Sequence, residues 1–209
     1  MRPTEVLTQE HRTIEVLFDR LVQTAFAAAR GDAPDVALAK RLVHALSALL
    51  GCWHRQKEEE LFFPLIQERG LTQAVMRAAL VEEAHESLGE DIKALANIVE
   101  RAEQDPSLWH AVGCRALDLA GHARSHMRNE EEIVFPLAEA SIRESDRAAL
   151  ISAFARIELL NPIPGAREDI EALVGQEVGG RGAMPEHVTG MVWAGTGAGR
   201  APALVRSCA

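Results

Sequence analysis

Apolar residues recur every three or four positions in four long stretches of the chain, which is the spacing that places them on one face of an α-helix. Glycine or proline interrupts the pattern at residues 31–34, 70 and 104–107. The sequence therefore predicts helices over residues 4–30, 35–68, 72–103 and 108–140. Long helices joined by short loops favour an all-α protein built as an up-down-up-down four-helix bundle.

The pattern becomes weaker after residue 143. It predicts a short fifth helix over residues 146–160 that caps the bundle, and one more over 166–174. Eight of the fifteen glycines fall in the last 35 residues, which indicates a flexible tail. We expect three parts: the bundle at 1–143, short helices at 144–174 and a flexible Gly-rich tail at 175–209.

A histidine replaces an apolar residue in the inward stripe of each long helix: His11, His54, His85 and His126. Counted from the turns near residues 33, 70 and 105, these four positions lie at nearly the same height in an antiparallel bundle. Glu58 and Glu130 follow the second and fourth histidines by four residues, one helical turn later on the same face. Four imidazoles and two carboxylates are thus predicted to meet in the middle of the bundle.

The second and fourth helices also carry the same motif. Residues 54–65 and 126–137 both contain His-xxx-Glu, a triplet of glutamates and a Phe-Pro-Leu ending, 72 positions apart. One His-xxx-Glu pair is common in helices, whereas the recurrence of all three features indicates an internal repeat. In a regular helix the inward face continues through Leu61 and Leu65 in the first copy and through Ile133 and Leu137 in the second.

Six polar groups buried at one level need either mutual pairing or a cation, because an unpaired buried charge is costly. Each hairpin supplies two histidines and one carboxylate, a ligand set associated with non-haem iron. Two such sets that face each other, with Glu58 and Glu130 between them, describe a site for two metal ions. Hydrogen-bonded core histidines are the structural alternative, and zinc, manganese or a mixed pair are alternatives for the metal.

Composition narrows the classes of partner. The formal net charge of −9, without a cluster of Lys and Arg, argues against nucleic acid. The N-terminus lacks the apolar core of a signal peptide, and we find no uninterrupted apolar run of about 20 residues, so no membrane partner is expected. The three cysteines, Cys52, Cys114 and Cys208, form no CxxC pair and predict no thiolate zinc site. We expect a cytoplasmic protein.

The motifs at residues 5–140 resemble those of the hemerythrin-like, HHE cation-binding family. The resemblance implies a non-haem di-iron centre with an oxo or hydroxo bridge, in which His11 and His54 bind one iron and His85 and His126 the other, bridged by Glu58 and Glu130. Hemerythrins that carry oxygen have HxxxH on the third helix and His-xxxx-Asp on the fourth. Here those places hold His85-xxx-Gly89 and His126-xxx-Glu130. This difference predicts a more open metal site, which favours reaction with peroxide or NO, or sensing, over reversible storage of oxygen.

Three functions fit this resemblance. The first is a binding or sensing protein for O2, NO or peroxide, in redox sensing or stress response, and the second is a di-iron enzyme that decomposes hydrogen peroxide. The third is an iron-handling or iron-sulfur repair protein, ranked last because the cysteine-bearing N-terminal segment usual in that family is missing.

His122, one turn before His126, is interpreted as a further ligand, a partner of a ligand or a surface residue. The remaining glutamates of the two triplets are interpreted as a solvated face or, for one of them, as support for a bridging carboxylate: Glu59, Glu60, Glu131 and Glu132. The oligomeric state is left open.

Overall fold

The computed structural model describes residues 1–175, and the side chains of all of these except residues 72–83. The first helix of the bundle is α1 (Pro3–Ala29). The second runs without a break through α2 (Val36–Ala48), the π-helical η1 (Leu49–Trp53), α3 (His54–Gln56), the π-helical η2 (Lys57–Phe62) and α4 (Phe63–Glu68). The third is α5 (Thr72–Ala102), and the fourth consists of the 3₁₀ turn η3 (Pro106–Leu108), α6 (Trp109–Asn129), the π-helical η4 (Glu130–Val134) and α7 (Phe135–Ser141).

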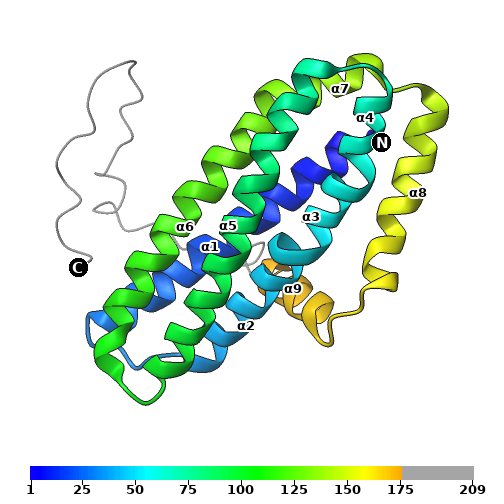
Figure 1. The fold of residues 1–209 in the computed structure, drawn as a ribbon. Helices are drawn as coiled ribbons and strands as arrows, with labels where there is room; N and C mark the ends of the chain where they lie inside the picture. Colours follow the sequence, from blue (N-terminus) through cyan, green and yellow to red (C-terminus); the bar gives the residue numbers. More distant parts are fainter. Residues whose placement is uncertain (176–209) are drawn as a thin grey trace, which may run out of the picture.

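These four helices run alternately up and down (Figure 1). No strand occurs within residues 1–175, so the predicted all-α bundle is confirmed. The ends of the helices follow from local chemistry. The side chain of Asp35 accepts a hydrogen bond from the backbone N–H of Leu38 and caps α2. Gly31 and Gly70 end the first and second helices with φ values of 104° and 79°, which only glycine adopts without strain.

The π-helical segments change which residues face the core. The regular-helix prediction placed Leu137 on the inward side, but this residue is 38% exposed. The residue that follows it, Ala138, is 0% exposed and faces the core instead. In the second helix, Phe62 and Ile66 are likewise buried more deeply than the predicted Leu61 and Leu65. A π turn holds more residues than an α turn and so advances the inward face along the sequence.

Each of the π-helical segments that cause these two changes ends just before a proline. Pro64 follows η2 by two residues, and Pro136 follows η4 by two residues. Proline has no N–H to donate to the preceding turn, and its ring disturbs the regular α-helical ladder at that point. The repeated motif therefore encodes a widened turn as well as the predicted metal ligands.

Two large apolar clusters, with a polar layer between them, fill the interior of the bundle, and a third, small cluster joins Ala48 and Trp53 of the second helix to Ile157 and Ala166. The larger cluster fills the end of the bundle near the loops at residues 30–35 and 103–106, and it includes Leu17, Leu46 and Leu95. The smaller one lies at the opposite end and includes Leu7, Phe62 and Phe135. The six predicted ligands lie in the layer between, so that apolar side chains close the site from both ends.

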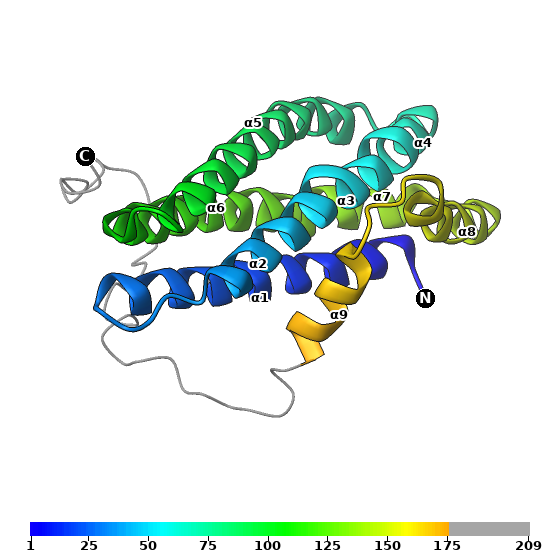
Figure 2. The same ribbon diagram turned by 90° about the horizontal axis from the view of Figure 1, so that it is seen from below.

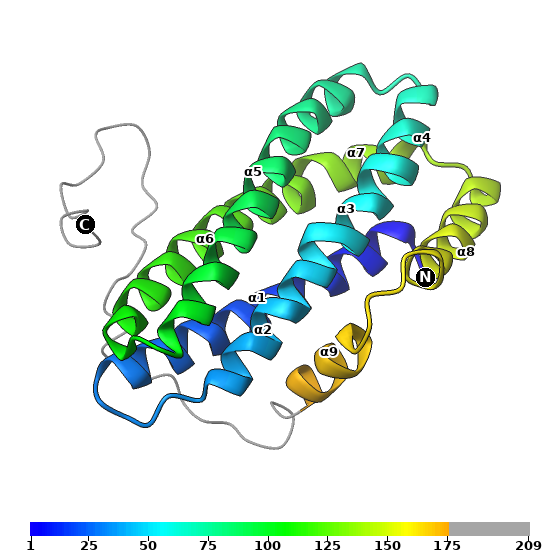
Figure 3. The same ribbon diagram turned by 60° about the horizontal axis from the view of Figure 1, so that its bottom comes forward.

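Two further helices pack against the outside of the bundle. Helix α8 (Glu144–Leu160) lies beside α4 and the start of α1 (Figures 2 and 3), where Leu150 and Phe154 join the smaller apolar cluster. Helix α9 (Ala166–Gly175) packs against α2 and contributes Leu173 to the larger cluster. Both helices fall where the sequence predicted them. The domain boundary at residue 143 stays a prediction, and the predicted flexible tail lies outside the described residues from residue 176 onward.

The continuous helix Val36–Glu68 also has the length and composition of a membrane span over an 18-residue window, with a mean hydropathy of 1.3, although the sequence analysis expected no such segment. Half of that window is buried inside the protein. Its apolar face, including Leu42 and Leu46, packs in the larger core cluster. The need to fill the bundle core thus accounts for this hydropathy.

Candidate metal centre

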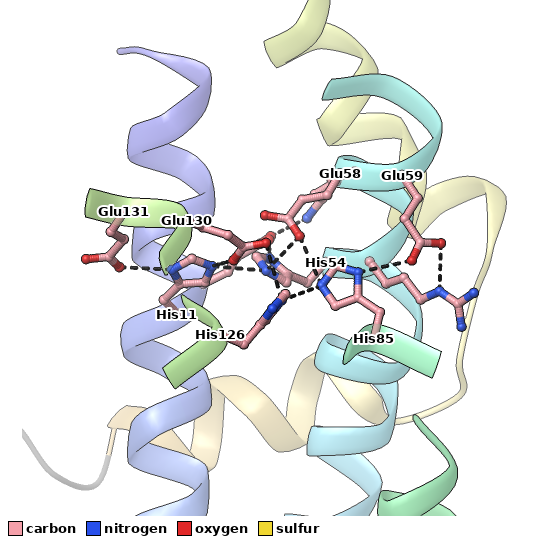
Figure 4. Close-up of polar contacts among 11 residues, drawn as sticks. His11, His54, Glu58, Glu59, His85, His126, Glu130 and Glu131 are labelled. Atoms are coloured by element: carbon pink, nitrogen blue, oxygen red, sulfur yellow. Dashed lines mark hydrogen bonds and ion pairs between the residues drawn. The ribbon is translucent and has the colours of Figure 1, made fainter. Parts of the chain in front are cut away.

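The structure brings all six predicted ligands together in one buried layer (Figure 4). They come from all four helices of the bundle, and each is between 0% and 9% exposed. The residues are His11 on α1, His54 on α3, Glu58 on η2, His85 on α5, His126 on α6 and Glu130 on η4. The helix register inferred from the turns is therefore correct for every one of them.

The six residues form two groups of four that share both carboxylates. One group is His11, His54, Glu58 and Glu130, and the other is His85, His126, Glu58 and Glu130. In each group, one ligand atom from every residue lies within 4.8 Å of the others. Each group presents two imidazole nitrogens and two carboxylate oxygens, and the shared glutamates lie between the two histidine pairs.

The Nε2 atoms of all four histidines point into the layer. The Nε2 atoms of His11 and His54 are 3.1 Å apart, and those of His85 and His126 are 2.8 Å apart. The carboxylate oxygens of Glu58 and Glu130 lie 3.2 to 3.5 Å from these nitrogens. The inner surface of the layer thus consists of nitrogen and oxygen atoms that can coordinate a cation.

Three of the histidines are oriented by an outer carboxylate. The Nδ1 of His11 donates to Glu131 at 2.9 Å, and the Nδ1 of His85 donates to Glu59 at 3.0 Å. The Nδ1 of His54 donates to Glu10 at 2.9 Å. A proton held on Nδ1 leaves the lone pair of Nε2 directed inward, which is the tautomer that a metal ligand needs.

These outer carboxylates correct the sequence interpretation, which assigned Glu59 and Glu131 to a solvated face. Both orient a histidine of the layer on a different helix, and only Glu60 and Glu132 of the two triplets are exposed. Glu10 was not singled out at all. The signal in the sequence was the repetition of the whole glutamate triplet, which two bridging carboxylates alone do not require.

His126 differs from the other three histidines. No carboxylate among the described residues accepts a hydrogen bond from its Nδ1, and the ring lines a surface pocket of about 470 Å³. The exposed His122 lines the same pocket and belongs to neither group of four. Among the interpretations of His122, its position therefore favours a surface residue near the site over a ligand.

The electrostatics of the layer reflect two carboxylates close together in a dry interior. Burial and the nearby Glu58 raise the pKa of Glu130 to about 8. Burial also opposes ionisation of Glu58, but the charges of His54 and His85 outweigh it and lower the pKa of Glu58 to about 2. For His85, the carboxylates of Glu58 and Glu59 more than offset burial and raise its pKa to about 10. Without a metal cation, protons bound to Glu130 and His85 must therefore offset the negative charge of the layer.

His126 shows the opposite effect, because burial and the charge on His85 lower its pKa to about 3. A neutral imidazole is the form that binds metals. All four carboxylate oxygens of Glu58 and Glu130 are buried and have no hydrogen-bond partner among the described residues. Orphaned oxygens of this kind are rare in folded proteins and fit a metal cation as their missing partner.

Comparison with known proteins agrees with this site. A family model described as hemerythrin HHE cation binding domain matches residues 2–152, which is more than half of the 209-residue chain and includes every residue of the layer. No curated protein matches the chain. The cation-binding description and the buried histidines and glutamates together indicate a metal-binding protein.

Proposed function

The chain belongs to the hemerythrin HHE cation-binding domain family, and on that basis we propose that its buried layer holds two non-haem iron ions and presents them to a small oxidant, namely O2, NO or hydrogen peroxide. The observation that carries this proposal is the pair of four-residue groups that share Glu58 and Glu130. Two groups of ligands that share both carboxylates would hold two metal ions, with Glu58 and Glu130 available to both, better than one ion on one side.

The number and type of ligands support iron. Each group offers two imidazoles and one oxygen from each of two carboxylates, so a six-coordinate ion keeps positions for solvent or a small ligand. Structural zinc sites are usually closed by four ligands, often with thiolates, and no cysteine belongs to either group. Ligand type selects the metal only loosely, and zinc and manganese remain the alternatives that metal analysis distinguishes.

The chain itself would orient the ligands and exclude water. Glu10, Glu59 and Glu131 hold three imidazoles in the metal-binding tautomer. Phe135 stacks on the ring of His11, with ring centroids 5.6 Å apart, and closes the layer toward the smaller apolar cluster. When bound, a pair of iron ions supplies one-electron redox chemistry and open coordination positions for the oxidant.

Decomposition of hydrogen peroxide is the second candidate function, favoured by one observation. The pocket at His126 carries His122, Glu132 and Asn129, which are side chains that can donate or accept a hydrogen bond beside the layer. Conversion of peroxide needs protons to be moved, and such groups can supply them. The binding or sensing function requires only access to the site, so a test of turnover separates the two.

The test starts from metal-free protein titrated with ferrous iron without oxygen. We expect uptake to stop at two iron ions per chain, and we expect the optical spectrum to change when O2, NO or peroxide is added. An electrode that follows dissolved oxygen and a peroxide assay then measure turnover. Binding without turnover supports the sensing function, and sustained loss of peroxide supports the enzyme. Saturation at one ion or none, without a spectral response, would contradict the proposal.

A further inference from the structure

Several contacts of the layer occur twice, once in each hairpin of the bundle. Glu131 accepts from His11 on the first helix, and its counterpart in the repeat, Glu59, accepts from His85 on the third. The two histidine pairs match as well, with Nε2 separations of 3.1 and 2.8 Å. The layer therefore has an approximate twofold symmetry that relates α1 to α5 and the second helix to the fourth.

The symmetry fails at one place. Glu10, which precedes His11, holds the Nδ1 of His54. The residue that precedes His85 is Ala84, whose methyl group cannot hold the Nδ1 of His126. Lys57, which donates to Glu10, has Asn129 as its counterpart 72 residues later. Both members of the Glu10–Lys57 pair are thus replaced by shorter side chains on the other half of the layer.

On the His54 half, this pair is covered by α8. Lys57 is 2% exposed, and its Nζ donates to Glu10 and, at 3.2 Å, to Glu158 of α8. Glu158 in turn accepts from Arg167. Figures 1 and 3 show α8 on the side of α3 and α4, away from α5 and α6. A chain of charged side chains and an added helix therefore close the layer at His54.

On the His126 half, a pocket of about 470 Å³ takes the place of that cover. Ala84 and Asn129, the two residues that break the symmetry, both line it together with His126 itself. A second surface pocket, of about 610 Å³, reaches Glu131 and Phe135, which lie against His11, but none of the six predicted ligands lines it. Of these two pockets, only the one at His126 reaches a predicted ligand.

We propose that the short side chains of Ala84 and Asn129 leave space for an entrance to the metal centre, and that an exogenous ligand reaches the His85 and His126 half of the layer through this pocket. The inference rests on the proposed function, because it assumes that metal fills the layer. The pocket is lined by His122, Ser125, Arg128, Asn129 and Glu132, so its chemistry suits a small polar molecule or anion that accepts hydrogen bonds. Azide is a probe of that size and chemistry.

The experiment closes the pocket by restoring the symmetry. The double variant Ala84→Glu with Asn129→Lys supplies the carboxylate and the ammonium that the His54 half already has. Ala84→Leu fills the same space without a charge. Ala111→Glu, at an exposed position on the same helix as His126, is the matched control for an added carboxylate. Each protein is loaded with iron, its metal content is measured, and azide binding is followed by stopped-flow absorbance.

We expect the double variant to hold two metal ions per chain and to bind azide at least about tenfold more slowly than the original protein and Ala111→Glu. A second readout does not depend on azide. A chelator should extract metal more slowly from the double variant, because the new carboxylate orients His126 and the pocket is filled.

The possible failures are distinguishable. If the original protein does not take up two metal ions or does not respond to azide, the proposed function fails. If it does both, and the double variant keeps two metal ions while azide binding and metal extraction proceed at their original rates, the entrance is not at Ala84 and Asn129. Should the double variant lose metal, Ala84→Leu applies the same test, since it leaves the charge of the layer unchanged.

Discussion

Glu131 accepts a hydrogen bond from the Nδ1 of His11 at 2.9 Å, across 120 residues of sequence, and its repeat counterpart Glu59 makes the same contact with His85. Each glutamate follows a predicted bridging carboxylate directly in the sequence. One short segment of each repeat therefore supplies a carboxylate of the layer and the group that orients a histidine on another helix. The Nε of Arg55 donates to Glu59 at 2.8 Å and holds this outer carboxylate in turn.

This relationship predicts the effect of removing an outer carboxylate. Glu59→Ala should leave the fold intact but lower metal affinity by about 10- to 100-fold, because His85 loses the group that fixes its tautomer and ring orientation. Glu60→Ala is the matched control, since Glu60 belongs to the same triplet and is exposed. Competition with a chromophoric chelator measures both affinities. Equal affinities for the two variants would show that the hydrogen bond from His85 to Glu59 has no part in binding.

Removing one histidine from each half should abolish metal binding. The double variant His54→Ala with His126→Ala takes one of two imidazoles from each group of four. The chain should stay largely helical, because the apolar clusters on either side of the layer are unchanged. Metal analysis and circular dichroism check the two expectations. Metal retained at the full stoichiometry would remove these residues from the site.

Much of this arrangement could be predicted from the sequence, because helix period and loop position are local features. The four inward histidines and the turns near residues 33, 70 and 105 were enough to place six ligands at one level. The phase of the core after Glu58 and Glu130 was not predictable in the same way, since counting by 3.6 residues assumes that no turn is widened. Ala138 is therefore buried where Leu137 was expected.

The outer partners of the histidines were also missed, for a different reason. A glutamate beside a ligand on a helix looks like a solvated residue unless the neighbouring helix is known. The role of Glu10 depends on where α3 lies relative to α1, and the pocket at His126 is lined by Ala84 of a different helix. Such features are set by contacts between helices, which the hydrophobic pattern of one helix does not contain.

The metal-free protein should become less stable as pH rises above neutrality. The pKa of Glu130 is raised to about 8 and that of His85 to about 10 in the folded protein. The folded state therefore holds protons that the unfolded chain releases at lower pH, and the stability they contribute is lost as pH rises through those values. Glu58 and His126, with pKa values of about 2 and about 3, act only below this range.

Urea unfolding in the presence of a chelator, compared at about pH 6.5 and about pH 9.5, measures this loss of stability. Glu130→Gln should show a smaller loss up to about pH 8, because it removes one of the two groups. With metal bound the trend should weaken, since the ligands are then already deprotonated. A metal-free protein whose stability is constant or rises over this pH range would contradict the charge distribution derived for the layer.

Deleting residues 176–209 should leave the metal content unchanged. Every residue of the layer and its outer carboxylates lies between Glu10 and Glu131, and the deletion spares Leu173, which packs in the larger core cluster. Metal analysis of the shortened and full-length proteins, prepared side by side, provides the comparison. A loss of metal on deletion would show that the predicted boundary of the metal-binding part is wrong.

The central claim is that two metal ions occupy the layer, one on each pair of histidines. Anomalous diffraction at the iron edge, from crystals of protein loaded with ferrous iron without oxygen, tests it most directly. We predict two iron peaks per chain, one beside His11 and His54 and the other beside His85 and His126, with Glu58 and Glu130 between them. A single peak, or iron bound away from these residues, would contradict the account.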